Sequence, residues 1–286
     1  MRKFEALSKK AAAAICAAVS VVVVCSSGSA AAPKADELVK QVVPHRAVYD
    51  LSLASPRGEG GVVEIDGRFE FEWNDVCDGW TVSQKSRFVV GRADGYDFVF
   101  GSSVSTWESK DGLRYRFFIS RKQNGEETEK IRGVASLHES GGPGTARFTE
   151  PATETAALPE GTMFPTTHSM EILERAVAGD RVPYWAVLFD GTGEDGGISG
   201  VSATLVSELD AGEPGALEDV EALEDQPSWR IAMGYFGLGQ NEAEPNQEQT
   251  IRMYRNGVVD FFSIDYGTFA FDASLVEFEE LARPEC

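Results

Sequence analysis

The chain has few residues of the kinds that usually carry catalysis or bind metals. It contains 4 cysteines and 3 histidines among 286 residues. It has no Cys-x-x-Cys pair, no His-Glu-x-x-His motif and no Gly-x-Ser-x-Gly sequence, so the usual signatures of thiol, zinc and serine chemistry are missing. His45 and His168 are interpreted as structural residues that hydrogen-bond locally, and no two of the three histidines, at 45, 138 and 168, have the spacing of a metal-ligand pair. We therefore predict no catalytic residue, no metal and no cofactor.

Two sequence patterns leave metal binding and catalysis as alternatives. The segment Asp190–Gly196 resembles a calcium loop, but its glycine falls one place late for an EF-hand, and Val201 stands where the closing glutamate belongs. A tight turn is our interpretation of this segment. Pairs of Asp and Glu side chains would suit an envelope hydrolase that acts on a glycan or an ester, which is the alternative to a binding protein.

The first 32 residues have the three parts of a secretory signal peptide. A basic start is followed by an Ala/Val run over residues 11–24 and then by small residues up to Ala32. The run is too short to predict a membrane span, and nothing after it would stop transfer. We expect cleavage between Ala30 and Ala32, and a periplasmic protein without a transmembrane anchor. Cys25 offers an alternative as a lipidated cysteine, but it follows valines where lipoprotein processing needs a small residue.

Cleavage would leave two cysteines, Cys77 and Cys286, far apart in the mature chain. In an oxidising compartment, two remaining thiols are expected to form one disulfide. It would close a loop of roughly 210 residues, and the chain-entropy model predicts that such a bond stabilises the folded state by about 5 kcal/mol. It would also hold a C-terminal tail that otherwise frays. A redox-active or metal-binding thiol is the alternative.

Positive charge is scarce. The formal net charge is −20, and removal of residues 1–32, whose own net charge is +3, takes it to −23. Such a charge opposes binding to nucleic acid, and to anionic lipid unless divalent cations bridge the two. No Lys or Arg occurs from Val182 to Trp229, and residues 209–228 combine acids with Gly and Pro. We interpret 209–228 as a solvated acidic loop, with a contact for a basic partner as the alternative.

Short strands account for most of the mature chain. Residues 62–73 alternate apolar and polar side chains over their second half, as a sheet with one wet face requires. Further strands are expected at 80–90, 96–107, 113–121, 129–137, 185–189, 201–209, 229–236, 249–254, 257–266 and 268–278. Asn124-Gly125 and Asn256-Gly257 predict tight turns with both residues at positive φ, and Asp66-Gly67, Asp94-Gly95 and Asp111-Gly112 predict further turns. Residues 33–286 are therefore predicted to form a single all-β domain, a large antiparallel sheet curled into a barrel or sandwich.

One helix is expected, at about residues 167–178. Thr166 and Thr167 are predicted to cap it, apolar residues follow at helical spacing, and Gly179 stands where a left-handed terminator belongs. Its apolar stripe would cover one face of the sheet or plug the mouth of a barrel.

Several motifs are spread over the mature chain: Val43–Leu53, Gly67-Arg68, Glu72-Trp73, Cys77–Gln84, Leu158–His168, Phe189–Gly191 and the terminal cysteine. Together they resemble the EipB family of periplasmic cell-envelope integrity proteins of Gram-negative bacteria. The resemblance implies a many-stranded antiparallel β-spiral, open like a half-barrel and similar to periplasmic lipoprotein carriers, with the family's disulfide at these two cysteines. It also implies a role in envelope integrity and genetic links to a periplasmic tetratricopeptide-repeat protein, and the family has no established enzymatic activity. The acidic segment after Leu209 has no counterpart in the family pattern.

The function predicted from these observations is non-enzymatic binding of a lipid, an acylated ligand, a lipoprotein segment or a protein partner on the concave face of the sheet. Phe69, Phe71 and Trp73 alternate along one strand and are expected to line that face. Phe164, beside the helix, is expected at its opening. Such sites are mostly apolar with a few polar anchors, although the same aromatic residues would also suit an ordinary core.

Overall fold

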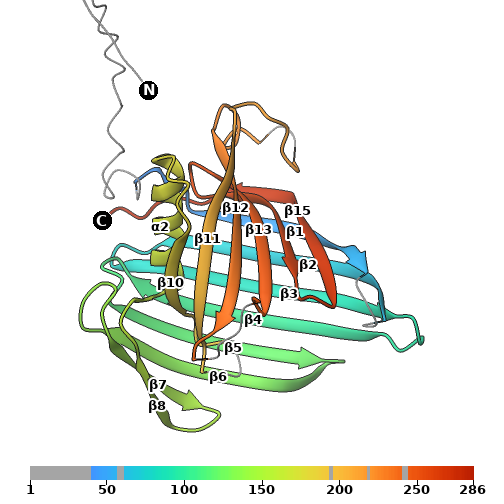
Figure 1. The fold of residues 1–286 in the computed structure, drawn as a ribbon, viewed down its shortest axis with the longest axis horizontal. Helices are drawn as coiled ribbons and strands as arrows, with labels where there is room; N and C mark the ends of the chain where they lie inside the picture. Colours follow the sequence, from blue (N-terminus) through green and yellow to red (C-terminus); the bar gives the residue numbers. More distant parts are fainter. Residues whose placement is uncertain (1–39, 57–60, 193–195, 218–219, 240–243) are drawn as a thin grey trace, which may run out of the picture. The chain divides into compact units, whose positions relative to one another are not determined.

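The computed structural model describes residues 40–286 apart from 57–60, 193–195, 218–219 and 240–243 (Figure 1). The expected signal peptide, with Cys16 and Cys25, lies outside the described residues. The strands are β1 (His45–Pro56), β2 (Val62–Asp75), β3 (Gly79–Arg92), β4 (Phe98–Ser109), β5 (Arg114–Gln123), β6 (Glu126–Leu137), β7 (Gly144–Glu150), β8 (Glu154–Leu158), β9 (Thr162–Met163), β10 (Tyr184–Phe189), β11 (Ile198–Leu209), β12 (Ser228–Gly237), β13 (Gln247–Tyr254), β14 (Val259–Asp265) and β15 (Phe269–Glu280), and the helix α2 (Pro165–Val177) lies between β9 and β10.

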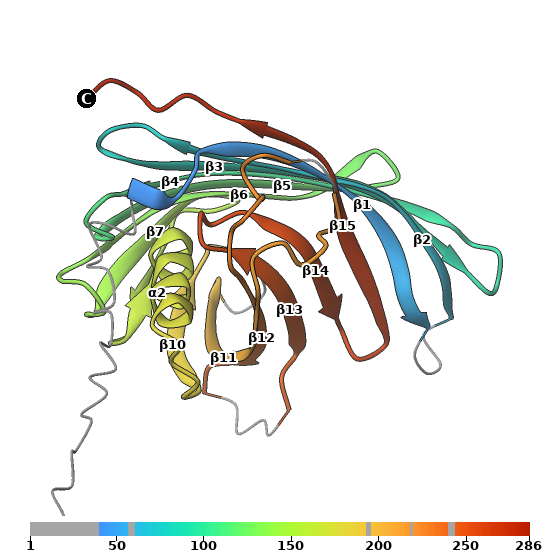
Figure 2. The same ribbon diagram turned by 90° about the horizontal axis from the view of Figure 1, so that it is seen from above.

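All fifteen strands belong to one sheet, in the order β8-β7-β6-β5-β4-β3-β2-β1-β15-β14-β13-β12-β11-β10-β9. Every neighbouring pair is antiparallel except β9 and β10, which are parallel. Strands β10–β13 cross in front of the long strands β2–β6 in Figure 1, and α2 lies with them on the same side of that layer in Figure 2. The sheet thus folds back over its own inner face. The predicted all-β open half-barrel with one helix packed on it is confirmed.

The predicted strand ranges match most strands but do not include β1, β7, β8 and the two-residue β9. One predicted turn is wrong, because Asp66-Gly67 lies inside β2. A Cβ at residue 67 would lie only 2.4 Å from the Arg87 carbonyl oxygen and 2.4 Å from the Phe88 Cβ on β3. This glycine is therefore required by the close approach of a neighbouring strand rather than by a turn.

The predicted hairpin turns are confirmed at the β5–β6 connection, where Asn124 and Gly125 both have positive φ. At the β13–β14 connection the hairpin forms, but of the predicted pair only Gly257 has positive φ. Asn256 instead donates its side-chain N–H to the Ala222 carbonyl at 2.6 Å and is buried. A contact with another segment of the chain therefore sets this turn.

The helix begins at Pro165, and Phe164 is its N-cap residue without a side-chain cap, so the predicted threonine cap is wrong. The buried carboxylate of Glu108, at the end of β4, takes its place. It accepts the backbone N–H groups of Thr166 at 2.7 Å and Thr167 at 2.8 Å, and the Thr167 hydroxyl at 2.5 Å. An acid on a distant strand thus satisfies the orphan donors of the helix and complements its dipole.

The C-terminal end of α2 follows the prediction. Gly179 has φ 69° and donates its N–H to the Ala176 carbonyl, and Asp180 donates to the Arg175 carbonyl. These two bonds form the glycine-terminated motif that the sequence indicated.

The acidic connection between β11 and β12 is attached to the sheet rather than solvated throughout. Leu223 is buried and packs with the core beneath β14 and β15. The Ala216 N–H donates to the carboxylate of Asp260 on β14 at 2.9 Å. The interpretation as a purely solvated loop missed the apolar residues between its acids.

Candidate functional site: an apolar cavity

A cavity of about 890 Å³ lies inside the half-barrel. The inner faces of β1–β4 and β12–β15 form its walls, side chains of β5 and β6 contribute, and the first turns of α2 border it. Its volume is in the range of sites that hold small organic ligands. We define these walls as the hollow half of the molecule.

Alternation along β2 brings three of the predicted residues to the cavity. Phe69, Phe71 and Trp73 line it. They pair with Ser86, Gln84 and Val82 on β3, respectively, and the first two of those partners line the cavity as well. Because side chains alternate across a strand, the acids between the three aromatics on β2 lie on the opposite face.

Phenylalanines from several strands meet across the cavity wall. The rings of Phe69 and Phe262 lie 5.5 Å apart edge to face, and those of Phe88 and Phe100 lie 5.6 Å apart. All four are only half-buried, although they face the inside of the half-barrel. Their free ring surface is what an apolar ligand would cover.

The α2 end of the cavity carries two buried histidines. Burial lowers the pKa of His168 to about 4. Burial also lowers the pKa of His45, whose Nδ1 lies 2.7 Å from the Val43 carbonyl oxygen. Both rings are therefore neutral near pH 7, so this end of the cavity offers no histidine cation.

Polar side chains face another part of the cavity. The Tyr235 hydroxyl donates to the Gln249 side-chain oxygen at 3.0 Å. Arg121 pairs with Glu129, and Arg92 pairs with Asp94 at 2.9 Å. No Asp or Glu is among the described residues that line the cavity. The cavity is thus apolar, with uncharged or cationic polar groups at its margins.

Phe164 lies elsewhere than predicted. It is fully buried and stacks on Tyr115 of β5, with ring centroids 5.1 Å apart, and it also contacts Phe189 of β10. It does not line the cavity. Residue 164 directly follows β9, whose parallel pairing with β10 carries it into a separate aromatic core. We define this core, which packs between β5–β8 and β9–β10, as the filled half.

The remaining chemical candidates are structural in the described part of the chain. Asp190 accepts the Thr192 N–H at 2.7 Å, as a turn requires, while Glu194 and Asp195 of the suspected calcium loop lie outside the described residues. Among the described residues no group of three or more His, Cys, Asp or Glu could hold a metal. Asp260, fully buried, accepts the Tyr254 hydroxyl at 3.1 Å, which engages it within the sheet.

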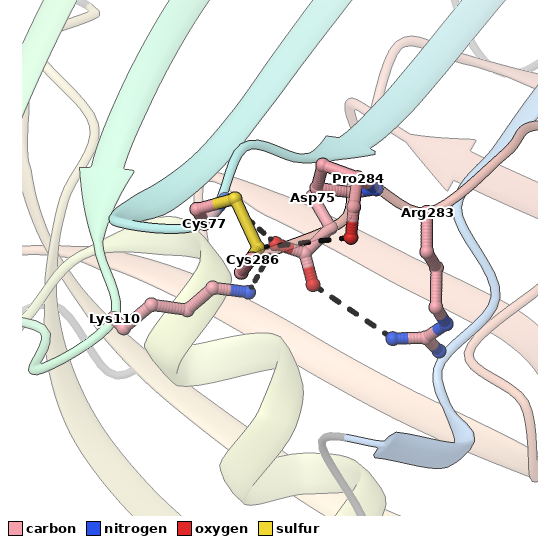
Figure 3. Close-up of a disulfide and its surroundings, with 6 residues drawn as sticks. All are labelled: Asp75, Cys77, Lys110, Arg283, Pro284 and Cys286. Atoms are coloured by element: carbon pink, nitrogen blue, oxygen red, sulfur yellow. Dashed lines mark hydrogen bonds and ion pairs between the residues drawn. A yellow bond between two sulfur atoms is a disulfide. The ribbon is translucent and has the colours of Figure 1, made fainter.

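Cys77 and Cys286 are joined by a disulfide across a sequence separation of 209 residues (Figure 3). Cys77 lies between β2 and β3, and Cys286 ends the tail that follows β15. The bond therefore joins the ends of strands that form the walls of the hollow half.

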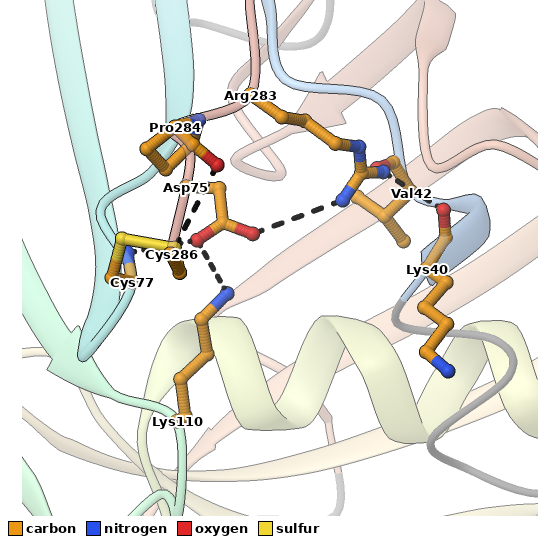
Figure 4. Close-up of polar contacts among 8 residues, drawn as sticks. All are labelled: Lys40, Val42, Asp75, Cys77, Lys110, Arg283, Pro284 and Cys286. Carbon is orange, nitrogen blue, oxygen red and sulfur yellow. Dashed lines mark hydrogen bonds and ion pairs between the residues drawn. A yellow bond between two sulfur atoms is a disulfide. The ribbon is translucent and has the colours of Figure 1, made fainter.

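Charged side chains reinforce this junction (Figure 4). Asp75 pairs with Lys110 at 2.9 Å and with Arg283 at 3.7 Å. Arg283 also donates to the carbonyl oxygens of Lys40 and Val42. The C-terminal tail, the first described residues and the end of β2 are thus tied at one point.

Sequence reasoning found the β2 wall of the cavity and missed most of the rest. The usable signal was alternation on β3, where Gln84, Ser86, Phe88 and Val90 all face inward. What a sequence could not reveal is which inward faces pack against each other and which leave space.

Comparisons with known proteins agree with the fold. A family model described as EipB-like matches residues 36–282. The chain is 28% identical to the cell envelope integrity protein EipB of Brucella abortus (strain 2308), over 87% of this chain and 88% of that protein. It also matches the crystal structure of a beta-barrel-like protein of domain of unknown function DUF1849 from Brucella abortus, with a TM-score of 0.77 and 26% identity, covering 84% of this chain and 99% of that one. None of the helices in the described part of the chain is long and apolar enough to cross a membrane.

Proposed function

This chain belongs to the EipB-like family, and from this membership we propose that it supports cell-envelope integrity as a periplasmic, non-enzymatic binding protein. Its ligand is an acyl chain, of a lipid or of an acylated protein, held in the cavity of the hollow half. The observation that carries the proposal is the aromatic lining of a cavity of about 890 Å³ that no part of the described chain fills.

The energetics favour an apolar occupant. Phe69, Phe88, Phe100 and Phe262 are half-buried and leave ring surface facing the cavity. Covering apolar surface is worth about 25 cal/mol for each Å² removed from water. An elongated acyl chain suits walls that come from eight strands and are apolar over most of their area.

The lining also supports a binding role over hydrolysis. Paired-carboxylate hydrolysis needs two acids facing the same substrate. The described residues that line the cavity include no acid. Glu108 and Asp260, which are buried outside it, are engaged by the N-terminus of α2 and by Tyr254, respectively. The proposed location rests on the signal-like residues 1–32 and is consistent with the disulfide.

The direct test is mass spectrometry of the organic extract of protein purified from the periplasm without detergent, followed by titration of the emptied protein with a fluorescent fatty acid. A stoichiometric lipid and saturable probe binding are expected. An empty protein that also fails to bind the probe would contradict the proposal and direct the search to protein partners, including the tetratricopeptide-repeat protein that the resemblance implies.

Neighbouring serines on β4 offer a matched pair of variants. Ser102 lines the cavity, whereas Ser103 lies on the outer face of the same strand. Ser102→Trp should fill part of the cavity and reduce probe affinity at least tenfold, and Ser103→Trp should leave it unchanged. Equal effects of the two substitutions would show that the probe binds elsewhere.

A further inference from the structure

The outer face of the sheet separates charge by sign. Strand register and exposure place eight basic side chains on the outer side of β3–β7, a segment that the structure describes without gaps: Lys85, Arg87, Arg114, Arg116, Lys122, Lys130, Arg132 and Arg147. Only two acids, Glu127 and Glu150, share that side of these strands. We call this surface the basic face.

The neighbouring strands have the opposite composition. On β15, β1 and β2 the outward acids are Asp50, Glu64, Asp66, Glu70, Glu72, Asp272, Glu277 and Glu279. Two arginines, Arg46 and Arg68, accompany them among the described residues, and both are paired with acids. The chain as a whole therefore has a negative net charge, whereas the basic face carries an excess of positive charge.

Distance keeps the two surfaces electrically separate. Neighbouring strands lie about 4.8 Å apart, so β5 to β7 lie roughly 14 to 24 Å from β2. Screening reduces interactions between exposed charges beyond about 8 Å at physiological ionic strength. A surface that approaches β5–β7 is thus exposed mainly to the positive charge.

Aromatic side chains stand among the cations. The guanidinium of Arg116 lies 4.6 Å from the ring centre of Trp107, and that of Arg132 lies 4.8 Å from the ring centre of Phe118. Strand pairing sets Trp107, Arg116, the exposed Val134 and Arg147 in one row. Cations with amphipathic aromatics between them are typical of surfaces that lie at a lipid head-group layer.

We propose that the basic face docks the protein on an anionic phospholipid bilayer surface. Figure 2 shows β3–β6 as one gently curved layer. The helix α2 and strands β10–β14 lie on the inner side of this layer, so they do not cover the basic face. A broad surface of this kind suits a plane of phosphate groups, whose boundary with the acyl region also accommodates Trp107 and Phe118. The site is distinct from the cavity and does not depend on it.

The test is co-sedimentation of the exported protein with vesicles of phosphatidylcholine and phosphatidylglycerol, and with phosphatidylcholine alone. None of the ion pairs between described residues involves Arg116 or Arg147, so their replacement breaks no ion pair and removes only the contact of Arg116 with the Trp107 ring. Arg116→Gln with Arg147→Gln should weaken binding to the anionic vesicles by about fivefold for each arginine, and so about 25-fold together. Arg181→Gln with Arg230→Gln removes the same charge from exposed positions outside the basic face and should leave binding unchanged.

Three outcomes would overturn the proposal. They are no binding to anionic vesicles, equal binding to neutral and anionic vesicles, and equal losses of binding in the two double variants. Capture by soluble polyglutamate without vesicle binding would assign the basic face to an acidic protein instead. Ser102→Trp should bind vesicles like the unaltered chain, so failure of the cavity proposal and failure of the docking proposal are distinguishable.

Discussion

The filled and hollow halves of this sheet are both lined by aromatic residues, yet only one is packed. In the filled half Tyr115, Phe117, Phe164 and Phe189 are each at most 3% exposed and contact one another. In the hollow half the phenylalanines of β2–β4 and β14 remain half-buried around a cavity. Aromatic content therefore does not decide whether a sheet face becomes a core or a binding site.

The difference lies in what approaches each face. In the filled half the connection from β9 into α2 inserts Phe164 between β5 and β10. In the hollow half the first turns of α2 border the cavity, but no described segment fills the space between the opposing strands. Stability should thus depend on close ring packing in the filled half, and in the hollow half on the tied ends of the strands together with the buried clusters around the cavity.

The largest loss of stability should come from removing the disulfide that joins strand ends of the hollow half. Cys286→Ser should lower the free energy of unfolding by about 5 kcal/mol, because the disulfide closes a loop with a sequence separation of 209 residues. Denaturant unfolding measures the loss, and hydrogen exchange should locate faster opening in β15 and β1–β3. Cys77→Ser should behave the same way, and an unchanged midpoint under oxidising conditions would contradict the role given to the bond.

The next effect should come from the filled half. Phe189→Ala should lower the free energy of unfolding by about 4 kcal/mol, because its fully buried ring contacts Tyr115, Phe117 and Phe164 and its loss leaves a void. Affinity for the fatty acid probe should not change in the folded fraction. A loss below about 1 kcal/mol would contradict the close packing assigned to the filled half.

His168 tests how dry the α2 end of the hollow half is. Its pKa is lowered to about 4 from 6.5, so the folded chain binds this proton less readily than the unfolded chain. The corresponding stability is complete above pH 6.5 and is lost as the pH falls to about 4, by up to about 3 kcal/mol.

The measurement is the free energy of unfolding at pH 7 and pH 4 for the unaltered chain and for His168→Gln. The unaltered chain should lose about 3 kcal/mol more than the variant over this interval. Equal losses would indicate that water reaches the ring and that the cavity is wet at this end.

Alternation, turn dipeptides and helical spacing are local signals, and they predicted the curled antiparallel sheet, the helix and its glycine terminator. The open half-barrel was implied by the family resemblance. The sequence placed Phe69, Phe71 and Trp73 correctly on an inner face, since a strand fixes which side chains share a side. It misplaced Phe164, because the position of that ring depends on a parallel pairing of two residues with a strand that follows in the chain. The sequence did not predict the Glu108 cap either, because this contact also depends on tertiary structure: the acid lies far from the helix in sequence.

The smallest expected effect on stability completes the comparison. Phe88 is as large as Phe189 but faces the cavity and is only half-buried. Phe88→Ala should therefore lower the free energy of unfolding by about 1 kcal/mol, because the change enlarges an existing space instead of creating a void in a packed core. It should still weaken the fatty acid probe severalfold, since it removes ring surface from the site. If Phe88→Ala destabilised the chain as much as Phe189→Ala, the hollow half would have to be packed in solution, and the binding function proposed for it would lose its basis.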